Sequence, residues 1–83
     1  MQMSSLVARG RVIAAARMLA GLDQHQLAAA AGLSPSTISK IEQGRKNVRR
    51  ETLRAVGEAL ERLGVDVTQN GRTGHHAVGT SYA

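Results

Sequence analysis

Six of the eleven lysine and arginine residues of this chain crowd into residues 40–54, where only Glu42 and Glu51 oppose them. The six are Lys40, Arg45, Lys46, Arg49, Arg50 and Arg54. This window therefore holds +4 of the formal net charge of +5. Clustered ammonium and guanidinium groups attract polyanions such as nucleic acid. A solvated, charged surface is the simpler interpretation, so the charge needs a second signal before it indicates a ligand.

That second signal lies just upstream, between residues 24 and 43. Ala28 has the small side chain that two closely crossing helices need, and Gly32 tolerates the positive φ of a tight turn. Ile38 and Ile41 share one face of a second helix and can pack back onto the first. This spacing predicts a helix-turn-helix, which holds its second helix ready for a DNA major groove. Charge directly after such a motif favours nucleic acid as the partner.

Four helices must position these groups. Apolar residues at helical spacing predict them at about 6–20 or 9–20, 24–31, 35–43 and 49–63. Asp23 and Ser34 are good N-caps, Pro35 suits a first helical position, and the glycines at positions 21 and 44 suit helix ends. Gly57 interrupts the last helix, where either close packing against the first helix or a simple weak spot would account for it.

The pattern changes after residue 64. The run V-D-V-T-Q alternates as a strand does, the Asn-Gly that follows is a strong turn signal, and H-A-V-G-T-S can form a second strand. A two-residue turn would set Val67 against Gly74, whereas a longer loop would set it near Ala77. Because an isolated hairpin is marginal in water, we expect it to pack on the last helix or to pair with another protomer. The alternative is a disordered tail.

Length and composition narrow the class of protein. The 83 residues make one small domain, which divides into a leader (1–8), a helix-turn-helix domain (9–64) and a hairpin or tail (65–83). Without cysteine, the chain has neither disulfides nor thiolate ligands, and its thin core makes dimerisation a plausible source of stability. No apolar run approaches the roughly 20 residues of a membrane span. No signal peptide is evident, so we expect a cytoplasmic protein.

We expect no enzyme, because no nucleophile stands in a recognisable pattern with a base. His75 and His76 are adjacent in an expected strand, where neighbouring side chains face opposite sides. With no cysteine and two aspartates, the chain offers little to a metal ion, and we expect neither a metal nor a cofactor.

Two stretches carry a resemblance to a known family: A-R-M-L-A-G-L-D-Q-H-Q-L-A-A-A-A-G-L-S-P-S-T-I-S-K-I-E-Q-G-R-K and E-T-L-R-A-V-G-E-A-L. They lie within residues 11–64, about two thirds of the chain, and resemble the Cro/phage-repressor type of helix-turn-helix protein, the XRE family. The resemblance implies a mainly α fold of four to five helices, followed here by the C-terminal β-hairpin. It also implies a DNA-binding transcriptional regulator that works as a dimer on a two-fold operator.

The exposed side of the second motif helix offers the side chains that meet base edges. With Ile38 and Ile41 inward, four residues point outward or toward the helix start. They are Pro35, Ser36, Thr37 and Lys40. Lys40 can donate to guanine, the two hydroxyls can read either base type, and the carbons of Pro35 and Thr37 can touch a thymine methyl. The alternatives are ordinary helix-start hydrogen bonding for the hydroxyls and a solvated charge for the lysine.

Six further residues are expected to hold the DNA backbone and fix the register rather than read sequence: Gln24, Arg45, Lys46, Asn47, Arg49 and Arg50. Gln24 opens its helix, where its amide and the free N–H groups can hold a phosphate. Cations at a helix start oppose the helix dipole, so a ligand explains Arg49 and Arg50 more readily than stability does. A plain surface helix start is the alternative.

Arg17 and Glu42 match a second feature of the family, in which an arginine of the first helix pairs with a glutamate near the end of the recognition helix. The resemblance implies a partly buried ion pair that orients the recognition helix.

We therefore expect a sequence-specific transcriptional regulator, a repressor, that binds an inverted repeat in double-stranded DNA as a homodimer. The alternative is an antitoxin, a class that the family includes, which blocks a toxin and also represses its own operon. Residues 65–83 would then bind the toxin. The same segment is the candidate dimerisation element, in which Val65, Val67, Ala77 and Val78 would form a shared apolar face.

Overall fold

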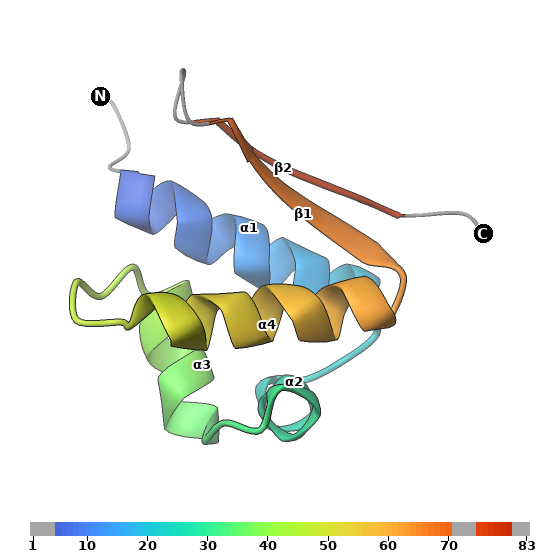
Figure 1. Cartoon of the computed structure of the whole chain (residues 1–83), viewed down its shortest axis with the longest axis horizontal. Helices are drawn as coiled ribbons and strands as arrows, with labels where there is room; N and C mark the ends of the chain where they lie inside the picture. The colour runs from blue at the N-terminus through green and yellow to red at the C-terminus, as the bar shows by residue number, and fades with distance from the viewer. Residues whose placement is uncertain (1–4, 71–74, 81–83) are drawn as a thin grey trace.

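A computed structural model describes residues 5–70 and 75–80. Four helices precede a hairpin: α1 (Ser5–Leu19), α2 (Gln24–Ala31), α3 (Pro35–Glu42), α4 (Arg50–Arg62), β1 (Val65–Asn70) and β2 (His75–Thr80). α2 packs against α3 and α4, and the hairpin lies against α1 and α4 (Figure 1). The predicted mainly helical fold with a C-terminal hairpin is confirmed. In the described part of the chain, no helix has the length and hydropathy that a membrane span requires.

The two helices of the motif begin and end where local signals place them. The Gln26 N–H donates to Asp23 Oδ1 at 2.7 Å, and the Asp23 N–H donates to Gln26 Oε1 at 2.8 Å, which together form a capping box at the start of α2. Gly32 follows α2 at φ +71°, in the left-handed region that favours glycine. Ser34 caps α3 by accepting the Thr37 N–H at 3.3 Å. Short-range chemistry therefore sets these three boundaries.

The first helix begins earlier than the assigned leader allows, because residues 5–8 are helical. A close approach explains the extension. A Cβ added at Gly10 would lie 2.6 Å from the backbone oxygen of Glu42 and 2.7 Å from that of Ile41. The backbone of α1 therefore rests directly on the end of α3, and this tertiary contact stabilises a turn that composition alone assigned to a leader. Residues 1–4 of that leader lie outside the described residues.

The core lies between the helices and is closed by the first strand. Leu27, Ile38, Ile41 and Leu60 are fully buried, and Val65 of β1 is only 2% exposed. Leu63 directly follows the last helix and is 46% exposed. The core is made of aliphatic side chains from all four helices and β1, as the scarcity of aromatic residues requires.

Gly57 does not serve helix packing within the protomer. A Cβ added at this position would meet no atom within 4 Å. Of the two explanations offered for this glycine, close packing against the first helix is therefore wrong. Gly57 is a weak spot in α4, where the freedom of glycine in the unfolded chain costs stability.

The hairpin pairs in a register that neither predicted turn produces. Val67 lies opposite Val78, so the two-residue turn with Gly74 is wrong, and the longer loop, which set Val67 near Ala77, was one residue out. A register shift of one residue moves every side chain of a strand to the other face, and burial therefore selects the register. Val65 is buried, and Val67 packs against the core from the same face of β1. Residues 75–80 form a strand, which contradicts the disordered tail for this part of the chain.

The buried face of β1 also bears on two residues of the candidate dimerisation element. Val65 and Val67 were expected to form a shared apolar face between two protomers. Instead, both pack against the core of their own protomer. Val65 is therefore covered within its own protomer, whereas Val67 stays partly exposed. The side chains of Ala77 and Val78 lie outside the description.

Candidate nucleic-acid interface

The recognition helix α3 has a buried side and an exposed side. Ile38 and Ile41 are fully buried, as predicted, whereas Ser36 and Lys40 are exposed. Thr37 and Pro35 are half-buried at the start of the helix. The four candidate base-contacting residues therefore lie on the first turns of α3 or on its exposed side.

The two hydroxyls are already engaged at the helix start. The Ser34 Oγ lies 2.8 Å from Thr37 Oγ1 and 3.1 Å from Ser36 Oγ, within hydrogen-bond distance of both. This is the ordinary helix-start role weighed for these residues. Each hydroxyl has one donor and two acceptor positions, so a single bond leaves capacity for a second partner.

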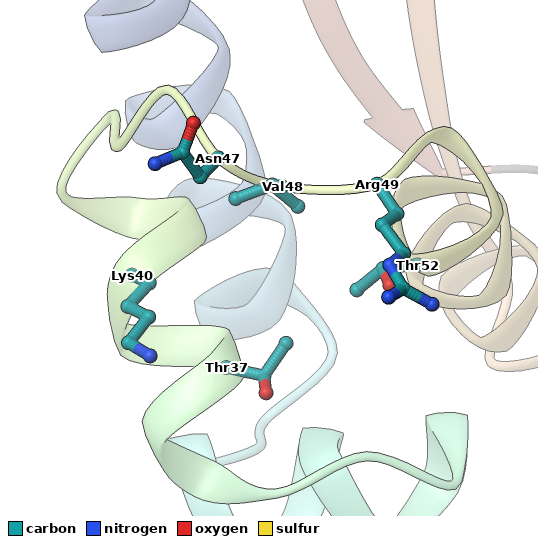
Figure 2. Close-up of a pocket in the computed structure, with 6 residues that line it drawn as sticks. All are labelled: Thr37, Lys40, Asn47, Val48, Arg49 and Thr52. Carbon is teal, nitrogen blue, oxygen red and sulfur yellow. The ribbon is translucent and has the colours of Figure 1, made fainter.

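A hollow of about 190 Å³ separates α3 from the start of α4. Figure 2 shows its walls: Thr37 and Lys40 from α3, Arg49 and Thr52 at the start of α4, and Asn47 and Val48 from the loop between them. Thr52 and Val48 were missed by sequence reasoning. The spacing of Thr52 was a usable signal. It lies three residues after Arg49, the N-cap of α4, and side chains at this spacing share one side of a helix.

A second hollow of about 380 Å³ shares part of this lining. Its lining residues are Lys40, Arg45, Lys46 and Asn47. The tertiary structure thus brings Lys40 of the recognition helix together with the loop residues predicted to hold phosphates. Among the described residues, no carboxylate forms an ion pair with these three cations. Their uncompensated charge makes this face attractive to an anion.

The start of α4 adds to the same face without helping the helix. Arg49 is the N-cap residue and provides no side-chain capping bond, and Arg50 begins the helix. Both are exposed. Positive charge at a helix N-terminus opposes the macrodipole, so these two arginines are better suited to an anionic ligand than to α4 itself.

Arg17 and Glu42 lie in contact behind the exposed face. The Arg17 Nε donates to Glu42 Oε2 at 2.8 Å, and its Nη2 donates to Oε1 at 3.1 Å. The side chains are only 16% and 8% exposed. The hydrogen bond to Glu42 is the main cause that raises the pKa of Arg17 above its ordinary value. This two-point contact joins α1 to the last residue of the recognition helix.

Gln24 was predicted to hold a phosphate, and its amide has a partner inside the protein. The Gln24 Nε2 donates to Glu42 Oε1 at 3.1 Å. Gln24 is the first residue of α2 and is half-buried. The sequence pattern gave no sign of this contact, because it joins residues 18 positions apart through a turn whose path only the fold determines.

Comparisons with known proteins agree with this architecture. Residues 13–68 match the family HTH_3, described as helix-turn-helix. The chain belongs to this family. Two solved structures of the clp gene regulator ClgR from Corynebacterium glutamicum are 33% identical to it, with TM-scores of 0.66 and 0.65. Each match covers 74% of this chain, and they cover 78% and 65% of the ClgR chains. The search of curated proteins found no match.

Membership of HTH_3, the XRE-type helix-turn-helix family, confirms the resemblance identified from the motif. It makes the chain a DNA-binding transcription regulator. The family match includes the whole of α2, α3 and α4 and the loop with the basic residues. The exposed side of α3 and this loop are therefore the candidate nucleic-acid interface.

Proposed function

We propose that this HTH_3 protein is a sequence-specific repressor that binds an inverted repeat in double-stranded DNA as a homodimer. The observation that carries the proposal is the convergence of Lys40 with Arg45, Lys46 and Asn47 around one hollow beside the exposed side of α3. An exposed cation on a recognition helix, flanked by loop cations that form no ion pair with a described carboxylate, suits a base edge between two phosphate contacts.

The base-reading role falls to α3. Lys40 donates to guanine O6 or N7, and Pro35, Ser36 and Thr37 meet the neighbouring base edges from the start of the helix. The backbone is held by Arg45, Lys46 and Asn47 on the loop, by Arg49 and Arg50 at the start of α4, and by Gln24 at the start of α2.

The size of the protein supports a dimer on adjacent half-sites. The longest dimension is 32 Å, which is similar to the roughly 34–36 Å of one DNA turn and so supports two copies side by side on adjacent half-sites. Met18, Leu19 and Leu63 are exposed large apolar side chains. They lie at the ends of α1 and α4, which point to the same side of the molecule, away from the α3–α4 loop (Figure 1). These ends offer apolar surface to a second copy.

Selection of bound duplexes from a random DNA library, at near-physiological salt, tests the proposal. We expect enrichment of an inverted repeat whose half-sites lie about one helical turn apart. The Lys40→Ala variant should lose the preference at one position of each half-site, whereas Arg45→Ala should weaken all duplexes alike. Salt-sensitive binding without any enriched sequence would contradict sequence-specific recognition.

Repression is measured with a reporter gene behind the selected sequence. Lower expression in the presence of the protein is expected, and higher expression would make it an activator. The cytoplasmic location and the antitoxin alternative stay predictions of the sequence.

A further inference from the structure

Glu42 is the last residue of the recognition helix and accepts hydrogen bonds from side chains of two other helices. Arg17 of α1 donates to both carboxylate oxygens, at 2.8 Å and 3.1 Å. Gln24 of α2 donates to Oε1 at 3.1 Å. Arg17 also donates from Nη1 to the backbone oxygen of Leu22 at 3.0 Å, in the turn that leads into α2. One carboxylate thus connects α1, α2 and α3.

This carboxylate stands where a helix does not favour it. Glu42 is the last residue of α3, and negative charge at a helix C-terminus opposes the macrodipole. Its side chain is only 8% exposed, so water does little to compensate for the charge. A carboxylate so shielded from water is stable only while its hydrogen bonds are made. Each of the hydrogen bonds from Arg17 and Gln24 therefore constrains its position.

Gln24 links α2 to α3 through its side chain. In the described part of the chain, it is the only side chain of α2 with a hydrogen bond to α3. Gln26 is used in the capping box with Asp23, and His25 is exposed. The contact from Gln24 therefore fixes how the start of α2 sits against the end of α3.

The same contact limits what Gln24 can offer to DNA. A phosphate only accepts hydrogen bonds, so it can bind the amide nitrogen but not the amide oxygen. One of the two N–H groups on that nitrogen points to Glu42. One N–H is then left for a phosphate, and a phosphate contact alone would not explain the link to α3.

We propose that Gln24 is a positioning residue for base recognition, which acts through Glu42 to set the orientation of α3. This inference rests on the proposed sequence-specific binding of DNA. Lys40 lies two residues before Glu42 on the same short helix, so a shift at Glu42 moves Lys40 relative to the base edges. Recognition by a few directional hydrogen bonds tolerates displacements of only about 0.5 Å.

The positioning role and the phosphate role predict different binding data. Loss of a phosphate contact weakens binding to every duplex by the same factor. Loss of a positioning contact weakens binding to the preferred duplex more than to a scrambled one. The ratio of the two dissociation constants therefore separates the roles, and a purely structural defect in α2 does not change it.

The test measures this ratio for Gln24→Met, which keeps the side-chain length and removes the donors. We expect the preference for the selected duplex to fall by about three- to tenfold, since hydrogen bonds to charged groups are worth at least this much. Gln26→Met is the matched control. It removes a hydrogen bond in the same helical turn, so it should lower the melting temperature and leave the preference unchanged.

A double variant strengthens the test. In a Glu42→Met background, which removes the acceptor oxygens, Gln24→Met should cause no further loss of preference, because the two residues act through one contact. Equal weakening of both duplexes by Gln24→Met, or independent losses in the double variant, would overturn the positioning role while leaving the proposed function intact. A wild-type protein with equal affinity for both duplexes would overturn the proposed function and this inference with it.

Discussion

The buried and exposed sides of α3 differ in packing and in how their charges are compensated. On the buried side, Ile38 and Ile41 are fully covered, and the charge of Glu42 is matched by Arg17 at 2.8 Å. On the exposed side, Lys40 and the cations of the following loop form no ion pair with any described carboxylate. Compensated charge and packing stabilise the fold, whereas uncompensated charge does not. The two sides therefore separate stability from the proposed DNA binding along a helix of eight residues.

The largest effect is expected on the buried side, from Glu42→Ala. This change leaves the guanidinium of Arg17 without its carboxylate at a site that is mostly shielded from water. Breaking a fully buried pair on one side costs about 3–5 kcal/mol of unfolding free energy, and this part-buried pair should approach the lower end of that range. Chemical denaturation measures this directly. An unchanged free energy of unfolding would mean that the pair contributes nothing and that the division between the two sides fails.

A smaller loss is expected from Gly10→Ala, on the helix that supports α3 from behind. The new methyl group would lie 2.6 Å from the Glu42 backbone oxygen, so α1 or α3 must shift. Overpacking of this kind costs about 1–3 kcal/mol. Thermal unfolding followed by circular dichroism measures the loss. A melting temperature equal to that of the wild type would show that the two backbones do not approach so closely.

The exposed side responds differently to Arg49→Ala combined with Arg50→Ala. Loss of two phosphate contacts should reduce the slope of log binding constant against log salt by about one unit for each residue. The melting temperature should stay the same or rise, because two cations leave a helix N-terminus. A titration of labelled duplex at several salt concentrations gives the slope.

Arg62→Ala is the matched control for this pair. Arg62 lies at the other end of α4 and donates to the Ala30 backbone oxygen at 2.9 Å. Its loss should lower stability slightly and leave the salt slope unchanged. If Arg62→Ala alters the slope as much as the pair does, the positive charge acts as a diffuse field rather than through contacts at the start of α4.

The smallest effect is expected from Gly57→Ala, and its sign is reversed. A methyl group there meets no atom within 4 Å, so the change adds helix propensity without a clash. A gain of up to about 1 kcal/mol in unfolding free energy is expected. Gly10→Ala makes the same chemical change and should have the opposite effect on stability. Comparison of the two variants therefore separates the effect of packing from that of helix propensity. A loss of stability at Gly57 would reveal an interface at this face of α4.

Local chemistry explains why so much of the motif was predictable. The predicted span of α2 is the observed one, because Asp23 caps it and Gly32 ends it in the left-handed conformation. The identity of α3 and its buried isoleucines followed from spacing alone. Longer-range features were harder to predict. The start of α1 was left open between residues 6 and 9, and the pairing of Val67 was one residue out, because the close backbone approach at Gly10 and the buried side chain of Val65 bear on these features.

The sequence by itself determined the helix-turn-helix, the basic window after it, and the family to which the chain belongs. These rest on caps, turns and side-chain period, which act over a few residues. Only the tertiary structure decided that Lys40 joins the loop cations around one hollow, that Val65 belongs to the core, and that Gln24 bonds to Glu42. Each of these joins segments far apart in the chain, and the relative placement of such segments depends on how the whole core packs.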